Sequence, residues 1–208
     1  MRSYLGIFAA MCGMVTLSTP SAHAFVPRSL DGNGVLVGSP VAPVQLEIFC
    51  DPQCPYCAEF ESADGDKLTG AVASGRAAIT YRWLTFLDPR HHNAVSARVA
   101  NALFVAADPA TTPTAYQAFA QDIYRHQSAD GPSIDDLAAM ARESGVPDRV
   151  ADRIASGETV VDTVAVNDAN KARLKDENPD PGTPTVYNLN TKSLVDLQDS
   201  GWLDALIS

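Results

Sequence analysis

The chain has 208 residues, of which 46% are hydrophobic and 19% are charged. This composition is typical of a globular protein and unlike that of a disordered or fibrous chain. The formal net charge of −10 opposes binding to phosphate backbones and anionic lipid surfaces, so we expect no nucleic acid partner. The length allows one large domain or two small ones.

Residues 1–24 have the pattern of a signal peptide. They carry one formal charge, their apolar run over 5–17 is too short to span a membrane, and they end in small residues at Ala24. We expect cleavage near Ala24, which leaves residues 25–208 in an extracytoplasmic place (periplasm, cell wall or medium) where disulfides persist. Lipid attachment at Cys12 is an alternative, but Met11 lies before it, where a lipid-attachment signal has a small residue.

The pattern of apolar and turn-forming residues predicts the elements in chain order. They are a short outer strand over 34–38, a strand over 44–49, a helix from Pro55 to about Gly75 with an irregularity at Gly65, a strand over 77–86, a helical block, short strands over 185–189 and 193–197, and a last helix from about Gly201. Strand, helix and strand over 44–86 form a βαβ unit, whose strands lie parallel. The sequence therefore predicts one α/β domain with a helical insertion at about 88–178.

The helical block has several apolar repeats at helical spacing. They predict helices that include Val95, Tyr116 and Ile134, with weaker patterns over 147–156 and 160–174. The helix at Ile134 is preceded by Ser133, a predicted N-cap with Asp136 three residues on. Four aromatic residues are predicted to be core by their spacing: Trp83, Tyr116, Phe119 and Tyr124.

Three cysteines remain after the expected cleavage, and all of them lie close together: Cys50, Cys54 and Cys57. A structural disulfide framework would join distant segments of the chain. A bridge between Cys54 and Cys57 closes only a tiny loop, which removes little entropy from the unfolded chain. The spacing therefore indicates chemistry rather than stabilisation.

The pair Cys54 and Cys57 lies where the second predicted strand passes into a helix. Unpaired N–H groups and the positive end of the helix dipole favour a thiolate there, so we expect a lowered pKa for Cys54 and a readily reduced disulfide. Pro55 fits the first turn of a helix, where its missing N–H is not needed. Tyr56 is predicted to tune the motif and to contact substrate.

The run from Phe49 to Cys57, Phe-x-Asp-Pro-x-Cys-Pro-Tyr-Cys, and the later Gly182-Thr183-Pro184 resemble the DsbA/DsbC/DsbG group of bacterial disulfide oxidoreductases, and most of all its DsbG and DsbC catalytic domains. The resemblance extends over about 34–208 in its order of elements. It implies a thioredoxin fold with an inserted helical domain. It also implies that Cys54 attacks, that Cys57 resolves, that Pro184 follows a cis peptide bond, and that Thr183 offers backbone hydrogen bonds to an extended substrate.

The chain departs from this group in two ways. DsbC and DsbG carry an N-terminal dimerisation domain before the catalytic one, whereas only residues 25–45 precede the strand here, so we expect a monomer. Thioredoxin and DsbA have an acidic residue six places before the first active cysteine. This chain has Ile48 at that position, and DsbC-type domains also have an apolar residue there. Glu47 is a candidate proton relay for Cys57, although a shift of one residue turns a strand side chain to the other face.

Two metal sites are alternatives to the dithiol. Cys50, Cys54 and Cys57 match the spacing of a radical-SAM iron–sulfur site, but such enzymes use a large barrel in a reducing cytosol. A zinc site would need a fourth ligand from His126 or the His91-His92 pair. We expect neither a metal nor a cofactor.

The sequence thus predicts an exported, DsbA-like thiol-disulfide oxidoreductase that acts as an oxidase or general oxidoreductase. Its partners would be exported proteins with thiols or disulfides and a membrane redox partner. A reductase or isomerase of DsbG type and a non-catalytic, chaperone-like binder are the alternatives. Cys50 is interpreted as a small buried residue, and exchange of its thiol with the active pair is the sharper hypothesis.

Overall fold

The computed structural model describes residues 26–208, so the predicted signal peptide and Cys12 lie outside the described residues. Its elements in chain order are β1 (Val35–Gly38), β2 (Val44–Cys50), α1 (Pro55–Ala73), β3 (Ala77–Trp83), α2 (Asp88–His91), α3 (Val95–Ala106), α4 (Pro113–Arg125), α5 (Ile134–Glu143), α6 (Asp148–Ala155), α7 (Thr163–Glu177), β4 (Thr185–Asn188), β5 (Ser193–Leu194) and α8 (Trp202–Ile207). In this part of the chain no helix is long and apolar enough to cross a membrane.

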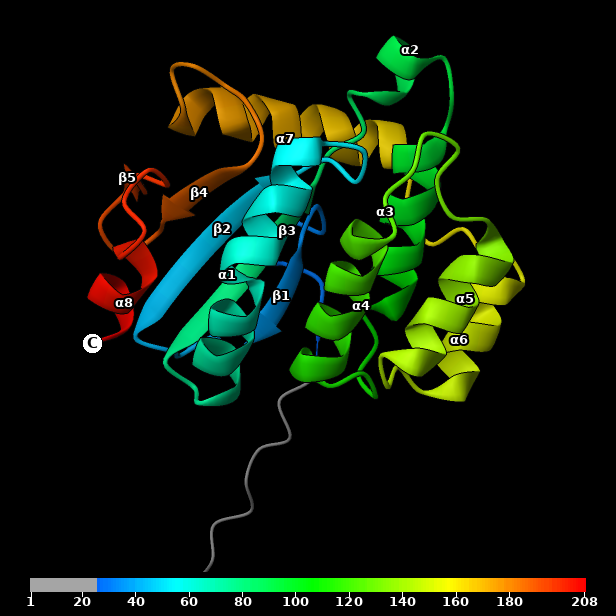
Figure 1. The fold of residues 1–208 in the computed structure, drawn as a ribbon, viewed down its shortest axis with the longest axis horizontal. Helices are drawn as coiled ribbons and strands as arrows, with labels where there is room; N and C mark the ends of the chain where they lie inside the picture. Colours follow the sequence, from blue (N-terminus) through cyan, green and yellow to red (C-terminus); the bar gives the residue numbers. More distant parts are fainter. Residues whose placement is uncertain (1–25) are drawn as a thin grey trace, which may run out of the picture.

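The strands form one mixed sheet in the order β1-β3-β2-β4-β5 (Figure 1). β2 pairs in parallel with β3, with Cys50 opposite Trp83, and α1 connects the two strands. This confirms the predicted βαβ unit, which arises because parallel neighbours need a crossover connection. β4 lies antiparallel to β2 on its other side, with Thr185 opposite Phe49. The C-terminal end of β2 and the N-terminal end of β4 therefore lie side by side at the same end of the strands.

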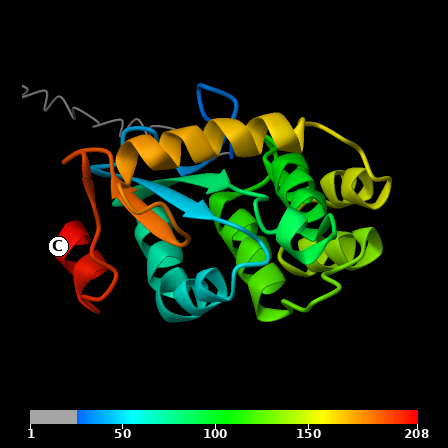
Figure 2. The same cartoon turned by 90° about the horizontal axis from the view of Figure 1, so that it is seen from above.

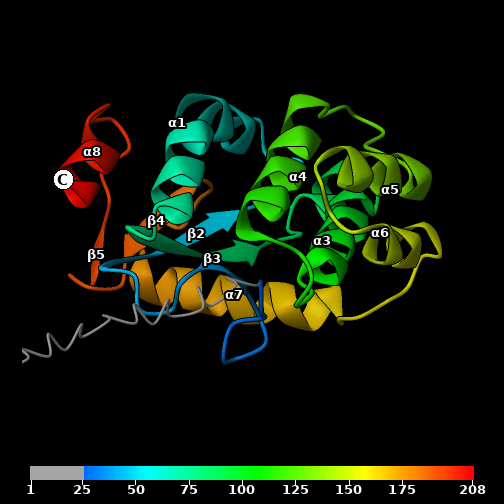
Figure 3. The same ribbon diagram turned by 90° about the horizontal axis from the view of Figure 1, so that it is seen from below.

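Helices cover both faces of the sheet. α1 and α4 lie on one face and α7 runs across the other, as Figures 2 and 3 show. Because strand side chains alternate, Ile48 and Cys50 point into the large core on the α1 side. Phe49 instead packs with Leu84 and with Leu174 of α7. The four aromatic residues predicted to be core are all buried.

The helical insertion lies between β3 and β4, and α3 to α6 form a block beside the sheet (Figure 1). The Ser133 capping box at α5 is present as predicted. α7 begins later than the sequence suggests, because the Asp162 side chain accepts hydrogen bonds from the N–H groups of Val164 and Ala165. β3 is shorter than predicted, since it ends at Trp83.

Helix α1 is continuous through Gly65, so the predicted irregularity there is wrong. Gly65 allows α1 to pack closely against α4. A Cβ atom at this position would lie 2.7 Å from Nε2 of Gln121 and 2.9 Å from Oε2 of Glu61. Gly65 thus lets the polar side chains of two helices meet beside the core.

Candidate active site

Cys54 is the N-cap residue of α1, and Pro55 follows it in the first turn. The Cys54 N–H donates to the carbonyl of Asp51 at 2.9 Å, which forms a tight turn after β2. The Cys54 carbonyl accepts hydrogen bonds from the N–H groups of Cys57 and Ala58 and starts the helix. The local sequence therefore holds the two cysteines of the motif one helical turn apart.

The second part of the site comes from the loop before β4. The peptide bond between Thr183 and Pro184 is cis. The Cys54 thiol donates a hydrogen bond to the carbonyl oxygen of Thr183, with 3.4 Å between Sγ and O. Cys54 keeps 5% of its surface exposed, whereas Cys57 has none. Of the two sulfurs, Cys54 is therefore the one that a partner can reach.

The pKa of the Cys54 thiol is raised, first by its hydrogen bond with the thiol of Cys57 and then by burial. The backbone N–H of Cys57 and the side chain of Thr183 hydrogen-bond to the same sulfur and act in the opposite direction. The sequence predicts a lowered pKa from the helix N-terminus, whereas in the dithiol the net direction for Cys54 is upward. The neighbouring thiol and desolvation raise the pKa of Cys54 by more than the N–H groups of the first helical turn lower it.

Cys50 lies directly behind the pair. Its thiol is a neighbour of the thiol of Cys57 and of the Tyr124 side chain, whose hydroxyl donates to the Asp51 carbonyl at 3.4 Å. Burial raises the pKa of both Cys50 and Cys57. The three cysteines therefore form one contiguous group of sulfurs, of which only Cys54 reaches the surface.

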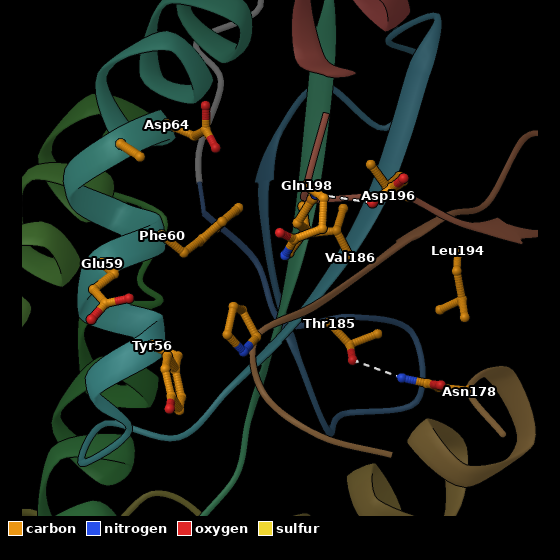
Figure 4. Close-up of a pocket in the computed structure, with 14 residues that line it drawn as sticks. Tyr56, Glu59, Phe60, Asp64, Asn178, Thr185, Val186, Leu194, Asp196 and Gln198 are labelled. Atoms are coloured by element: carbon orange, nitrogen blue, oxygen red, sulfur yellow. Dashed lines mark hydrogen bonds between the residues drawn. The ribbon is translucent and has the colours of Figure 1, made fainter. Parts of the chain in front are cut away.

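A groove of about 510 Å³ begins beside Pro184. Figure 4 shows its two walls: Tyr56, Glu59, Phe60 and Asp64 project from α1, and Thr185, Val186, Leu194, Asp196 and Gln198 lie opposite them. Tyr56 is 65% exposed at the end next to the motif. Three of the residues that line the groove are carboxylates, and none of these described residues is Lys, Arg or His.

The structure places Glu47, the candidate proton relay, beside two arginines. Its carboxylate binds the Arg82 guanidinium at 2.6 Å and the Arg173 guanidinium at 2.7 Å. Arg173 belongs to α7, so Glu47 points to the face of the sheet opposite α1 and Cys57. The alternation of β2 side chains separates Glu47 from the thiols, and its two ion pairs give it a structural role.

A different carboxyl group lies on the thiol side of the sheet. Glu61 is one helical turn after Cys57 on α1, and burial raises its pKa to about 7. Its Oε1 accepts a long hydrogen bond of 3.5 Å from Tyr81, and its Oε2 has no partner among the described residues. The sequence analysis missed Glu61, although its position four residues after Cys57 on a helix was a usable signal.

The motif loop also anchors the helical insertion, which the sequence analysis did not foresee. The Asp51 carboxylate accepts hydrogen bonds from the Ser96 hydroxyl and from the N–H of Leu87. The Gln53 side chain donates to Asp88 at 2.7 Å and bonds to His91 at 3.0 Å. These buried polar contacts fix the start of the insertion against the residues just before Cys54.

No group of side chains in residues 26–208 is arranged to hold a metal ion. The three cysteines are all free thiols, and their side chains are neighbours of one another. The site is thus built from sulfur, backbone and buried polar side chains.

Comparison with known proteins agrees with this geometry. Residues 30–207 match the family described as Thioredoxin. The fold is similar to MdbA, a thiol-disulfide oxidoreductase from Corynebacterium diphtheriae, with a TM-score of 0.73 and 20% identity over 89% of this chain and 95% of that one. It is also similar to the reduced disulfide bond oxidoreductase DsbG from Mycobacterium tuberculosis, with a TM-score of 0.65 and 25% identity over 85% and 86% of the two chains.

A curated relative is the serine/threonine-protein kinase PknE of Mycobacterium tuberculosis, which is 32% identical over 181 residues. The match covers 84% of this chain and 31% of that protein, so this chain spans under a third of the length of the relative.

The fold and the site define a protein of thioredoxin fold with a helical insertion over α3–α7 and a pair of cysteines at the start of α1. The chain belongs to the thioredoxin family.

Proposed function

We propose that this chain is an extracytoplasmic enzyme that exchanges disulfides with exported proteins through Cys54 and Cys57. The observation that carries the proposal is the position of Cys54, which lies at a helix N-terminus, beside the carbonyl of Thr183, with the fully buried Cys57 thiol as its neighbour. An incoming sulfur meets Cys54 first, and the second thiol is close enough to resolve the product.

In the oxidising direction, a substrate thiolate attacks Sγ of Cys54 in the Cys54–Cys57 disulfide. The bond between the two enzyme sulfurs breaks, and its electron pair leaves with Cys57. A second substrate thiolate then attacks the substrate sulfur of the mixed disulfide and expels Cys54. The substrate leaves as a disulfide, and the enzyme keeps both electrons as a dithiol that has taken up two protons.

The groove beside Pro184 supports a site for an extended segment of substrate. An extended chain there would pass Tyr56 and the start of β4, with its cysteine at Cys54 and its backbone at Thr183. The carboxylates of Glu59, Asp64 and Asp196 favour substrates with basic residues near the reacting cysteine.

We propose a general oxidoreductase as the first candidate and a strong oxidase as the second. A strong oxidase of this kind has a reduced form that is especially stable. Here the thiol of Cys57 and burial raise the pKa of Cys54, so a stable thiolate contributes less to the reduced state. A membrane redox partner would then recharge the enzyme after each reaction.

The deciding measurement is the redox potential in glutathione buffers, made beside assays of insulin reduction and of cysteine-peptide oxidation. We expect a potential of about −180 mV, in the range of protein disulfide isomerase. A value near about −120 mV would assign an oxidase, and one near about −270 mV would assign a reductase. If a Cys54→Ser, Cys57→Ser double variant kept full biological activity, the protein would be a chaperone-like binder and not an enzyme.

Export rests on the pattern of residues 1–24. Expression of the full chain in a bacterial host, followed by cell fractionation and N-terminal sequencing, tests it. We expect the exported protein to begin near Phe25. An uncleaved chain in the cytoplasm would remove the extracytoplasmic assignment.

A further inference from the structure

The exchange reaction uses two cysteines, yet the fold brings a third sulfur to the same place. The thiol of Cys57 is a neighbour of the thiol of Cys54 and also of that of Cys50. All three residues belong to one buried cluster, and neither Cys50 nor Cys57 has any exposed surface. The residue order in space is therefore Cys50, Cys57, Cys54, with the resolving cysteine in the middle.

The position of Cys50 is held by the sheet. It is the last residue of β2, where it pairs with Trp83, and its carbonyl accepts a hydrogen bond of 2.8 Å from the N–H of Leu84. The turn from Asp51 to Cys54 then brings the chain back, so that α1 starts beside the end of the strand that precedes it. Backbone hydrogen bonds on both sides thus keep the Cys50 sulfur close to Cys57.

This order matches what thiol–disulfide exchange requires. A thiolate attacks one sulfur of a disulfide and the other sulfur leaves, so three sulfurs take part with the attacked sulfur in the centre. When Cys54 and Cys57 are joined, Cys57 is the sulfur that Cys50 contacts. Cys54 is the sulfur that would leave.

We propose that Cys50 is a third redox-active cysteine, which exchanges with the Cys54–Cys57 disulfide to form a Cys50–Cys57 disulfide. The thiolate of Cys50 attacks Sγ of Cys57, the bond between Cys57 and Cys54 breaks, and its electron pair leaves with Cys54. The proton lost by Cys50 ends on Cys54. One disulfide forms and one breaks, so the step needs no external oxidant or reductant.

The consequence of this exchange rests on the proposed function. The oxidised enzyme would hold its disulfide between two fully buried sulfurs, while Cys54 becomes a free thiol at the surface. In that form Cys54 can attack a disulfide in a substrate, which the Cys54–Cys57 form cannot do. A single oxidised protein would then both donate disulfides and rearrange them.

Neighbouring groups set the rate at which the exchanged form appears. Burial raises the pKa of Cys50, the hydrogen bond from Cys57 lowers it, and the buried carboxyl of Glu61 raises it. The Tyr124 side chain, from α4, also lies beside the sulfur, and its hydroxyl donates to the Asp51 carbonyl at 3.4 Å. Since only the thiolate attacks, the exchanged form is a slowly formed fraction of the oxidised protein.

The test is alkylation of the oxidised full chain. The wild-type protein is oxidised with oxidised glutathione, freed of oxidant, incubated with iodoacetamide, denatured and cleaved before Asp51. This cleavage separates Cys50 from the other two cysteines, so a Cys50–Cys57 bridge joins two peptides. We expect a two-peptide species that carries one carbamidomethyl group on Cys54. Finding only Cys54–Cys57 bridges inside one peptide, with no label on Cys54, would overturn the proposal.

Two variants complete the experiment. In Cys50→Ala no free thiol remains within the motif of the oxidised protein, so label on Cys54 should disappear. In Cys54→Ser, oxidised glutathione should join Cys50 to Cys57, with loss of two hydrogen atoms from the intact mass. A Cys54→Ser protein that keeps both thiols, while circular dichroism shows it folded like the wild type, would also contradict the proposal.

The outcome is separable from that of the proposed function. If Cys50→Ala and the wild type oxidise a dithiol peptide equally and the wild type shows no label on Cys54, only the third-cysteine proposal fails. If the wild type forms the Cys50–Cys57 bridge but oxidises no peptide, the proposed function fails and the internal exchange stands.

Discussion

The sulfur of Cys54 lies 3.4 Å from the carbonyl oxygen of Thr183, a residue 129 positions later in the chain. The contact joins the start of α1 to the loop before β4, and it depends on β4 pairing with β2 in the sheet. The pairing of β4 with β2 therefore positions both the sulfur of Cys54 and the backbone of Thr183, which is the candidate site for substrate.

Replacing each active cysteine should give a different product. Cys54→Ser removes the only one of the two sulfurs with exposed surface, so enzyme-dependent oxidation of a dithiol peptide should fall to the uncatalysed rate. Cys57→Ala keeps the attacking thiol but lacks the resolving one, so a mixed disulfide between Cys54 and substrate should accumulate. Non-reducing mass spectrometry distinguishes the two. Rapid turnover by Cys57→Ala would contradict the assigned roles.

The groove predicts a preference for basic substrates. We expect a cysteine peptide with flanking Lys residues to react several-fold faster, in kcat/KM, than one with flanking Glu, because each exposed ion pair contributes about 1 kcal/mol or less. The double variant Glu59→Gln, Asp196→Asn should lose this difference, and high salt should weaken it. Glu143→Gln, which changes an exposed residue of α5 outside the groove, is the matched control. Equal rates for both peptides in the wild type would refute the preference.

Two glycines of the same helix should respond differently to alanine. At Gly70 an added Cβ meets nothing within 4 Å, so Gly70→Ala should raise the free energy of unfolding by about 1 kcal/mol. At Gly65 the Cβ would displace the Gln121 amide, which donates to Thr69 at 3.2 Å, and loss of that bond offsets the gain by about 1 kcal/mol. Urea unfolding measures both. Equal stabilisation would show that Gly65 is not needed for packing.

The buried carboxyl of Glu61 should make stability depend on pH. Its pKa is about 7 in the folded protein against a usual value of 4.5, so its favourable contribution is complete below pH 4.5 and is lost as the pH rises through 7. Relative to Glu61→Gln, the wild type should lose about 3 kcal/mol of unfolding free energy across this window, at roughly 1.4 kcal/mol per unit. Urea titrations of both proteins at a series of pH values test this. A difference that stays constant with pH would exclude the raised pKa.

Glu47 should matter for stability and not for exchange. Glu47→Gln takes one of two carboxylates from the Arg82 guanidinium, which is 5% exposed and keeps Asp31 at 2.7 Å, so the loss should lie below the about 3–5 kcal/mol of a fully broken buried ion pair. We expect a clear drop in the urea midpoint. The rate of peptide oxidation per folded molecule should equal that of the wild type. A selective loss of activity at unchanged stability would restore the proton-relay hypothesis.

The sequence by itself determined the local parts of the site. A β-rich run, a Cys-Pro-x-Cys and an apolar helical repeat are enough to predict a strand that passes directly into a helix with Cys54 at its start. These features depend on neighbours within one or two turns, and that is the range over which backbone propensity and capping act. The parallel βαβ unit follows from the same pattern, because the connection between its strands is itself a helix.

The tertiary structure alone decided which groups face the sulfurs. Glu47 and Glu61 are both acidic and both buried, yet one binds two arginines across the sheet and the other lies beside the thiols with an unpartnered oxygen. The raised pKa of Cys54 and the contact between Cys50 and Cys57 likewise arise from burial and from atoms brought together by folding. Propensity follows from adjacent residues, whereas desolvation and charge depend on every element packed around a group, so only the folded chain defines them.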